Sequence, residues 1–176
     1  MNQPKMRATL LVIFISLLAV PALGQTNSDR SKFAVSVDAG VTVPHGDLST
    51  FLDPGFSLNT GLEYMITPRF SAEGTFGYHR FSTFFGDNTN LYELSGKGKF
   101  YLVDESTKLR PFIEGGAGAY VTDSATTHFG VSVGGGVLYE VTKKVGVRGS
   151  YRFHNVFTSG ATTTFSTVQG GVRFRF

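Results

Sequence analysis

The sequence predicts an all-β fold, an eight-stranded antiparallel up-and-down β-barrel whose strands cross a membrane. Three observations favour this class. Apolar and polar residues alternate with period two along most of the chain, and no window holds a convincing 3.6-residue apolar period. Turns separate segments of roughly ten to twelve residues, and short and long turns alternate. The charged residues of these segments share one face.

Eight segments fit the period-two pattern. They are residues 33–43, 56–66, 69–80, 91–102, 109–121, 129–141, 145–154 and 166–176. Tight connections follow the second, fourth and sixth segments, whereas long loops are expected at residues 44–54, 82–90 and 155–164. This alternation is typical of transmembrane barrels. A strand of about eleven residues, tilted by about 40°, rises about 28 Å, close to the apolar band of about 25 Å in such barrels.

The first 24 residues predict a cleavable signal peptide. Lys5 and Arg7 precede an apolar run over residues 8–20, and small residues follow at Ala22 and Gly24. The run holds about 13 residues, short of the roughly 20 that a membrane-spanning helix needs. Residues 25–32 form a short polar segment, and residues 33–176 are the predicted barrel. We therefore expect a Sec-exported protein of the bacterial outer membrane with both termini in the periplasm.

Composition excludes several classes. The chain has no cysteine, so it has no disulfide framework and no thiolate metal site. The signal peptide holds two of the 16 basic residues and none of the 13 acidic ones, so its removal lowers the formal net charge from +3 to +1. No basic patch suggests a nucleic-acid partner.

The residue types on the two faces of the segments indicate which face lies in the lumen and which faces lipid. The charged residues of one face are Asp38, Glu63, Glu73, Glu93, Lys97, Lys99, Glu114, Glu140, Arg148, Arg152, Arg173 and Arg175. The other face is apolar except for Arg80 at a strand end. A lysine or arginine facing lipid near the midplane costs about 2–4 kcal/mol, so the charged face is assigned to the lumen. Strand adjacency places Lys97 between Glu73 and Glu114 and brings Arg173 beside Asp38. Eight strands are filled by their own side chains, so we expect a lumenal salt-bridge network and no wide pore.

Aromatic residues on the apolar face form two predicted girdles, as expected at two membrane interfaces. Near the short-turn end they are Phe33, Tyr64, Phe70, Phe100, Tyr139 and Phe176. Near the long-loop end they are Phe56, Tyr78, Tyr92, Phe129 and Phe153.

The chain resembles the small OmpA/OmpX-like outer-membrane barrels over nearly all of residues 33–176. The similar stretches are "GVTVPHGDLS", "RPFIEGGAGAYV", "VGVRGSYRF" and the closing "GGVRFRF". The resemblance implies a porin-like barrel domain. We also expect no cofactor. The resemblance further implies an insertion signal, because a terminal aromatic residue on an alternating strand resembles the signal that the barrel-insertion machinery reads in that family. Val172, Phe174 and Phe176 match this pattern.

Catalytic interpretations of the sequence are weaker than structural ones. "YRFHNVFTSG" slightly resembles the active strand of lipid A deacylase barrels, where a serine follows the histidine by two positions, but Val156 follows His154 here. Glu73, Glu93 and Glu114 could serve as paired carboxylates for glycosidic chemistry, although each has a basic neighbour available. Hydrogen bonding in the lumen or at its rim is the expected role of His79 and His154.

A metal site at Asp38 or Asp47 with His45 has no ligand-spaced cluster behind it. We accordingly expect no enzyme and no bound metal.

The expected function is structural or surface-interacting. The long loops present apolar residues that commonly mark contacts with an extracellular partner or with lipopolysaccharide. These residues are Phe51, Leu52, Phe84, Phe85 and Phe157. Packing over the barrel mouth is the alternative role for them. Two other classes stay open: a narrow passive channel for small solutes, and a secreted lipocalin-like barrel with its apolar face inward.

Overall fold

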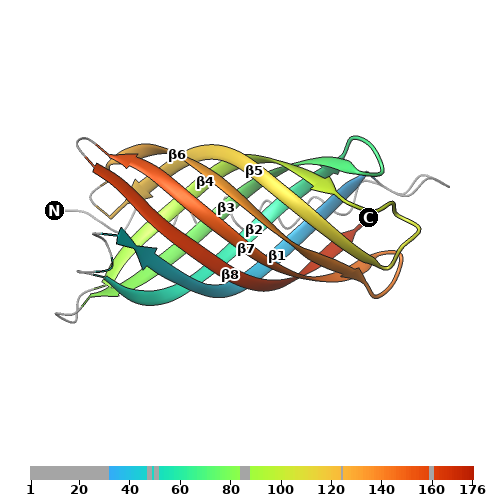
Figure 1. Ribbon diagram of the computed structural model, residues 1–176, viewed down its shortest axis with the longest axis horizontal. Coiled ribbons are helices and arrows are strands. Elements are labelled where there is room, and N and C mark those ends of the chain that lie inside the picture. Colours follow the sequence, from blue (N-terminus) through green and yellow to red (C-terminus); the bar gives the residue numbers. More distant parts are fainter. Residues whose placement is uncertain (1–31, 47–48, 50–51, 84–87, 124, 159–160) are drawn as a thin grey trace, which may run out of the picture. The chain divides into compact units, whose positions relative to one another are not determined.

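A computed structural model describes residues 32–46, 49, 52–83, 88–123, 125–158 and 161–176. In them, eight antiparallel strands form a closed barrel in which β8 is hydrogen-bonded back to β1 (Figure 1). The strands are β1 (Phe33–His45), β2 (Leu52–Met65), β3 (Phe70–Thr83), β4 (Asn88–Tyr101), β5 (Leu109–Thr122), β6 (Thr127–Glu140), β7 (Val145–Thr158) and β8 (Ala161–Arg175). The predicted fold class is confirmed. The predicted signal peptide, residues 1–24, lies outside the described residues.

We call the end with the connections 66–69, 102–108 and 141–144 the turn end, and the opposite end, with the connections 46–51, 84–87, 123–126 and 159–160, the loop end (Figure 1). The predicted contrast between short and long connections is wrong, because the strands extend further than expected at the loop end. At the turn end the strands begin and end within one residue of the predicted positions. No helix in the described part of the chain is long and apolar enough to span a membrane.

The connecting loops at the loop end are shorter than the sequence predicted. β7 continues to Thr158 and β8 begins at Ala161, so residues predicted to form the loop 155–164 pair instead, Val156 with Thr163 and Thr158 with Ala161. Residues 44–45, 52–54, 82–83 and 88–90 likewise belong to strands. The physical reason is that pairing satisfies the backbone hydrogen bonds of these residues, many of which are β-branched. The predicted loop tips were therefore too long.

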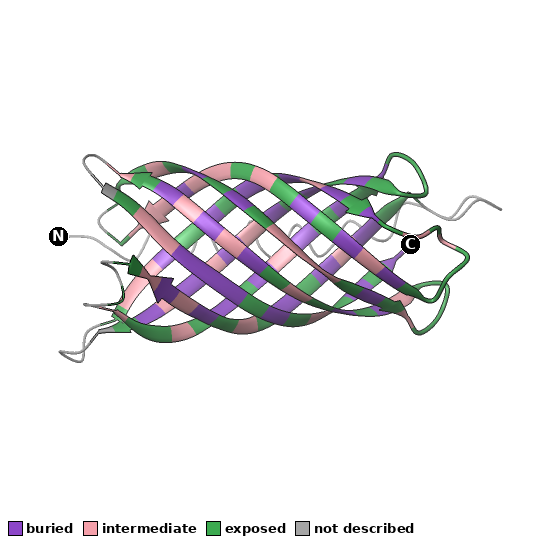
Figure 2. Cartoon of the chain, viewed as in Figure 1, coloured by how far each residue is buried: buried purple, intermediate pink, exposed green. Residues whose placement is uncertain are grey.

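Burial alternates along most of the length of the strands (Figure 2). The outward positions are apolar and exposed, as at Val133 and Leu94, whereas the inward positions are buried and mostly polar. Leu94 keeps 66% of its surface exposed although it lies in the middle of β4. A barrel with its apolar side chains outside and its charges inside is the opposite of a lipocalin, which binds its ligand in an apolar interior. The fold thus places the charged residues in the lumen.

Candidate functional site: a charge network in the barrel lumen

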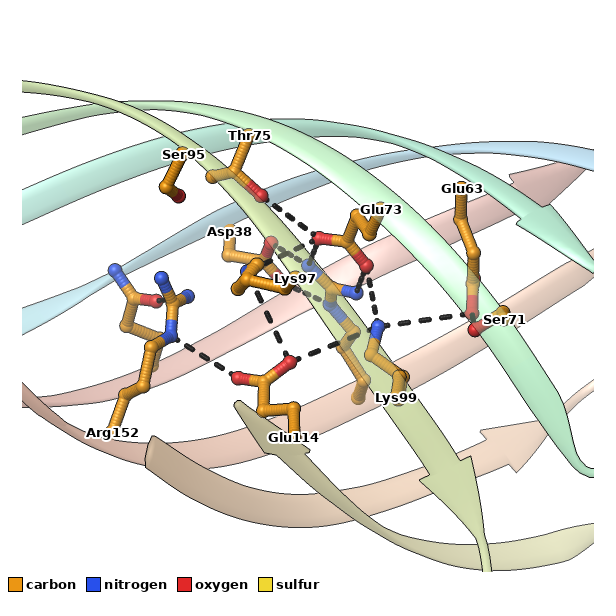
Figure 3. Close-up of polar contacts among 12 residues, drawn as sticks. Asp38, Glu63, Ser71, Glu73, Thr75, Ser95, Lys97, Lys99, Glu114 and Arg152 are labelled. Carbon is orange, nitrogen blue, oxygen red and sulfur yellow. Dashed lines mark hydrogen bonds and ion pairs between the residues drawn. The ribbon is translucent and has the colours of Figure 1, made fainter. Parts of the chain in front are cut away.

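Glu73 of β3 is the centre of the lumenal charges, and three cations converge on its carboxylate (Figure 3). Lys99 Nζ lies 2.5 Å from Glu73 Oε2, and Arg148 Nη1 lies 3.2 Å from the same oxygen. Lys97 Nζ lies 3.4 Å from Glu73 Oε1, and the Thr75 hydroxyl donates to that oxygen at 3.2 Å. All five side chains are buried. A buried charge is tolerated when it is paired and hydrogen-bonded in this way.

Asp38 of β1 is held by Arg148, which reaches it from β7. Arg148 Nε donates to Asp38 Oδ1 at 2.6 Å, and Nη2 donates to Oδ2. The sequence-based placement of Arg173 beside Asp38 is wrong, because Asp38 lies opposite Gly171 and Arg173 lies opposite Ser36. The register at which the barrel closes sets Arg173 one inward position nearer the turn end. There its guanidinium reaches a different carboxylate, that of Glu63.

Glu63 forms the part of the network nearest the turn end. Arg173 Nε donates to Glu63 Oε2 at 2.6 Å. The hydroxyls of Ser71 and Tyr101 donate to Oε1 at 2.6 Å and 2.8 Å, and Lys99 Nζ lies 3.8 Å from it. Lys99 thereby joins the Glu63 and Glu73 groups into one network (Figure 3).

Arg152 of β7 links the centre to the loop end. Its Nε donates to Glu114 Oε1 at 3.1 Å, and its Nη1 lies 3.6 Å from Glu93 Oε1. Gln169 accepts a hydrogen bond from Nη2 at 3.2 Å. Lys97 lies between two carboxylates, since its Nζ is also 3.9 Å from Glu114 Oε2 (Figure 3). The charges therefore alternate in sign along the lumen.

Two ion pairs at the turn end involve four further charged residues. Arg175 Nη2 donates to Glu105 Oε1 at 2.6 Å, and Arg110 Nη1 donates to Glu140 Oε1 at 3.4 Å. Arg110 and Glu105 were not among the predicted network residues. Arg110 has the same parity as Glu114, so the face assignment could have found it. Glu105 lies in a turn, where parity gives no signal.

Two apolar clusters lie inside the barrel, one on each side of the charges. The loop-end plug consists of Phe81, Leu91, Tyr120, Val156 and Phe165, with Leu52 packed against it. The turn-end plug consists of Met65, Tyr101, Phe112 and Leu138. Sequence reasoning missed both plugs, because it assigned the inward face to charge alone. The five core members of the loop-end plug and the four of the turn-end plug are buried.

Phe165 is the centre of the loop-end plug. Its ring stacks on His154 at 4.4 Å between centroids and meets Phe81 edge-on at 5.5 Å. Tyr120 adds its ring to this group, and its hydroxyl pairs with His154 Nδ1 at 2.9 Å. Gly130 makes room for it, since a Cβ there would lie 2.5 Å from Tyr120 Cε2.

The histidines serve hydrogen bonding in the lumen. His79 Nε2 lies 3.1 Å from Glu93 Oε2, and His154 Nδ1 lies 3.9 Å from the same oxygen. Val156, two positions after His154, is a buried plug residue. Among the described residues, no group of three or more histidine or acidic side chains is arranged so that it could hold a metal ion. Asp47 lies outside the described residues.

The predicted girdle residues lie on the outer face. Phe33, Tyr64, Phe70, Phe100 and Tyr139 are exposed near the turn end, and Phe56, Tyr92 and Phe129 are exposed near the loop end, where Tyr78 and Phe153 are half-buried. Neighbouring rings touch, as Phe33 and Tyr64 do at 4.9 Å between centroids. Phe176 follows the last residue of β8.

The surface of the turn end holds one arginine–aspartate pair outside the strands. Arg69 donates to Asp104 through Nε at 2.6 Å and through Nη2 at 2.8 Å. These hydrogen bonds lower the pKa of Asp104 below its ordinary value of 3.8 and raise the pKa of Arg69. The pair is solvent-exposed, so it contributes little to stability.

A closed eight-stranded barrel with an apolar outer surface, two aromatic girdles and charged side chains inside is a transmembrane β-barrel of the outer-membrane type. The chain belongs to the family defined by the outer membrane protein beta-barrel domain, whose model matches residues 10–176. It is thus an OmpA/OmpX-like protein of the bacterial outer membrane. A search of curated protein sequences finds no match.

Solved structures show the same fold. Neisserial surface protein A is 19% identical, with a TM-score of 0.69 over 85% of this chain and 100% of that one. OprG from Pseudomonas aeruginosa is 9% identical, with a TM-score of 0.58 over 84% of this chain and 97% of that one. The outer membrane enzyme PagL is 15% identical, with a TM-score of 0.55 over 81% of this chain and 99% of that one. The fold is therefore shared by a surface protein and by an enzyme.

Proposed function

We propose that the protein is a closed, non-enzymatic scaffold of the outer membrane that displays its loop end at the cell surface. The observation that carries the proposal is the filled lumen. Five buried carboxylates and seven buried cations occupy it, with an apolar plug on each side. Moving a solute through would require breaking several buried ion pairs, and each charge left unpaired is costly. This favours a scaffold over a passive channel.

The scaffold role includes an orientation. We place both termini in the periplasm after Sec export and removal of residues 1–24. The barrel-insertion machinery reads Val172, Phe174 and Phe176, of which Val172 and Phe174 are exposed on the outer face of β8. The loop end then faces the outer leaflet, where lipopolysaccharide and extracellular partners are found. Phe157, near the end of β7, is exposed there for such contacts, whereas Leu52 packs against the loop-end plug. Phe51, Phe84 and Phe85 lie outside the described residues.

Because the lumen is closed in this proposal, we expect the protein to conduct no ions across a bilayer. Purified protein reconstituted into a planar bilayer is expected to show no discrete, reproducible openings, because the ion pairs of Glu114 and Arg148 hold the lumen shut. The matched comparison is the Arg148→Gln variant, whose loss of charge weakens the seal. Regular openings of the wild-type protein whose size changes in Arg148→Gln would replace the scaffold with a channel.

The orientation is testable because the chain has no cysteine of its own. Ser49 at the loop end and Ser106 at the turn end are both exposed, so each accepts a single cysteine. On intact cells, a membrane-impermeant maleimide is expected to label Ser49→Cys and to leave Ser106→Cys unmodified until the cells are lysed. The reverse labelling pattern would invert the proposed topology.

A further inference from the structure

The acidic residues at the turn end are already paired with arginine. Asp104 accepts two hydrogen bonds from Arg69, Glu105 binds Arg175 at 2.6 Å, and Glu140 binds Arg110 at 3.4 Å. These are the side-chain carboxylates of the described connections and strand ends on this side. They therefore have little capacity to neutralise further cations.

Four lysines of the turn end have no carboxylate partner in the part of the chain that the structure describes. Lys32, Lys108, Lys143 and Lys144 are exposed, and none forms an ion pair within the described ranges. We call them the lysine ring. In contrast, the charged lysine, arginine and acidic side chains described at the loop end are Asp53, Asp123 and Arg80. The two ends of the barrel thus differ in the sign of their surface charge.

The lysines are distributed around the rim rather than gathered on one side. The backbone carbonyl of Lys32 accepts from Met65 N at 2.7 Å, that of Lys108 from Glu140 N at 2.8 Å and that of Lys144 from Arg175 N at 2.7 Å. These bonds place the lysines at three different strand pairs, β1–β2, β5–β6 and β7–β8 (Figure 1). A single protein partner would not contact such a distribution at once, whereas surrounding lipids would.

Three of the four lysines also border the apolar belt. Lys32 precedes Phe33, Lys108 precedes Leu109, and both apolar side chains are about half exposed on the outer face. Lys144 precedes Val145, which lies opposite Phe174 of the same face. A lysine at the edge of a lipid-facing belt extends its aliphatic chain along the apolar surface and holds its ammonium at headgroup level.

From this geometry we propose that the lysine ring binds the phosphate groups of anionic phospholipids in the leaflet that surrounds the turn end. The ammonium groups lie where the headgroups are, and no carboxylate among the described residues forms an ion pair with them. An anionic membrane surface attracts each nearby lysine strongly enough for a preference of about five-fold. The ring would give the barrel an annulus enriched in anionic lipid at one end only. The proposal does not depend on the orientation proposed above.

The test is lipid selectivity in reconstituted vesicles. The full chain in phosphatidylcholine vesicles is probed by electron paramagnetic resonance with spin-labelled phosphatidylglycerol and, separately, spin-labelled phosphatidylcholine. We expect the relative association constant to favour phosphatidylglycerol several-fold, up to about five-fold per contacted lysine, and to fall in concentrated salt, which screens surface charges. With all four lysines replaced by glutamine, the preference is expected to disappear.

Two further variants keep the test decisive. Arg69→Gln/Asp104→Asn removes a charge pair from the same rim without changing the net charge, so its preference should equal that of the wild type. Lys143→Gln/Lys144→Gln should lower the preference for phosphatidylglycerol partly. This double variant replaces the fourfold variant in the test if the fourfold variant does not fold. Folding is judged by heat-modifiable migration in gels. An unchanged preference in folded fourfold and double variants would overturn the proposal. A wild-type protein that shows no preference for phosphatidylglycerol would also overturn the proposal. The lysines would then be assigned to a soluble acidic partner.

Discussion

Replacing Glu73 with glutamine is expected to lower the free energy of unfolding by about 3–5 kcal/mol, the usual cost of breaking a buried ion pair by removing one partner. The carboxylate compensates Lys97, Lys99 and Arg148 at distances between 2.5 and 3.4 Å. Glutamine keeps the shape but leaves a surplus of positive charge in a buried lumen. Urea unfolding in detergent micelles or lipid vesicles measures this loss of stability. Because the chain has no tryptophan, circular dichroism or gel migration is used to follow the unfolding.

A second substitution separates charge imbalance from lost packing. In Glu73→Gln/Lys99→Met one cation leaves with the carboxylate, so part of the lost stability should return. Asp104→Asn removes an exposed carboxylate at the turn end and should change the unfolding midpoint very little. If Glu73→Gln were as stable as the wild type, the lumenal charges would be hydrated and the closed-lumen account would fail.

Replacing Phe165 with alanine is expected to cost about 3–5 kcal/mol, as is typical for the truncation of a buried phenylalanine. The side chain is fully buried. It contacts His154, His79 and Phe81 through its ring. The cavity would sit in the loop-end plug, so the barrel should lose stability and its loop end should open more often. Urea unfolding and hydrogen exchange of the backbone near β8 report the two effects.

The control for the plug is an outward ring near the same end. Phe157 faces outward with about half of its surface exposed, so Phe157→Ala should cost less than Phe165→Ala. Phe165→Leu retains most of the buried volume and should lose little stability. Equal losses in Phe165→Ala and Phe157→Ala would mean that the inner cluster does not stabilise the barrel more than a lipid-facing side chain does.

The sequence by itself determined the fold class and the face of nearly every strand residue. Side chains in a strand alternate with period two, and the cost of placing lysine or arginine in lipid separates the faces without any knowledge of contacts. Parity therefore grouped Glu73, Lys97 and Arg148 on one face, and the cost of charge in lipid assigned that face to the lumen. The turn-end boundaries followed too, because proline and short polar turns interrupt the pattern there.

The tertiary structure alone decided which charges meet. Parity places Asp38 and Arg173 on one face but does not fix the register at which β8 closes on β1, and that register sends Arg148 to Asp38 and Arg173 to Glu63. The tertiary structure also decided that Phe165, an inward residue, belongs to the loop-end plug. Inward residues near the middle of the barrel are charged, whereas those of the plugs near its ends are apolar. Local alternation carries no information on height or on strand closure, which arise only when all eight strands are paired.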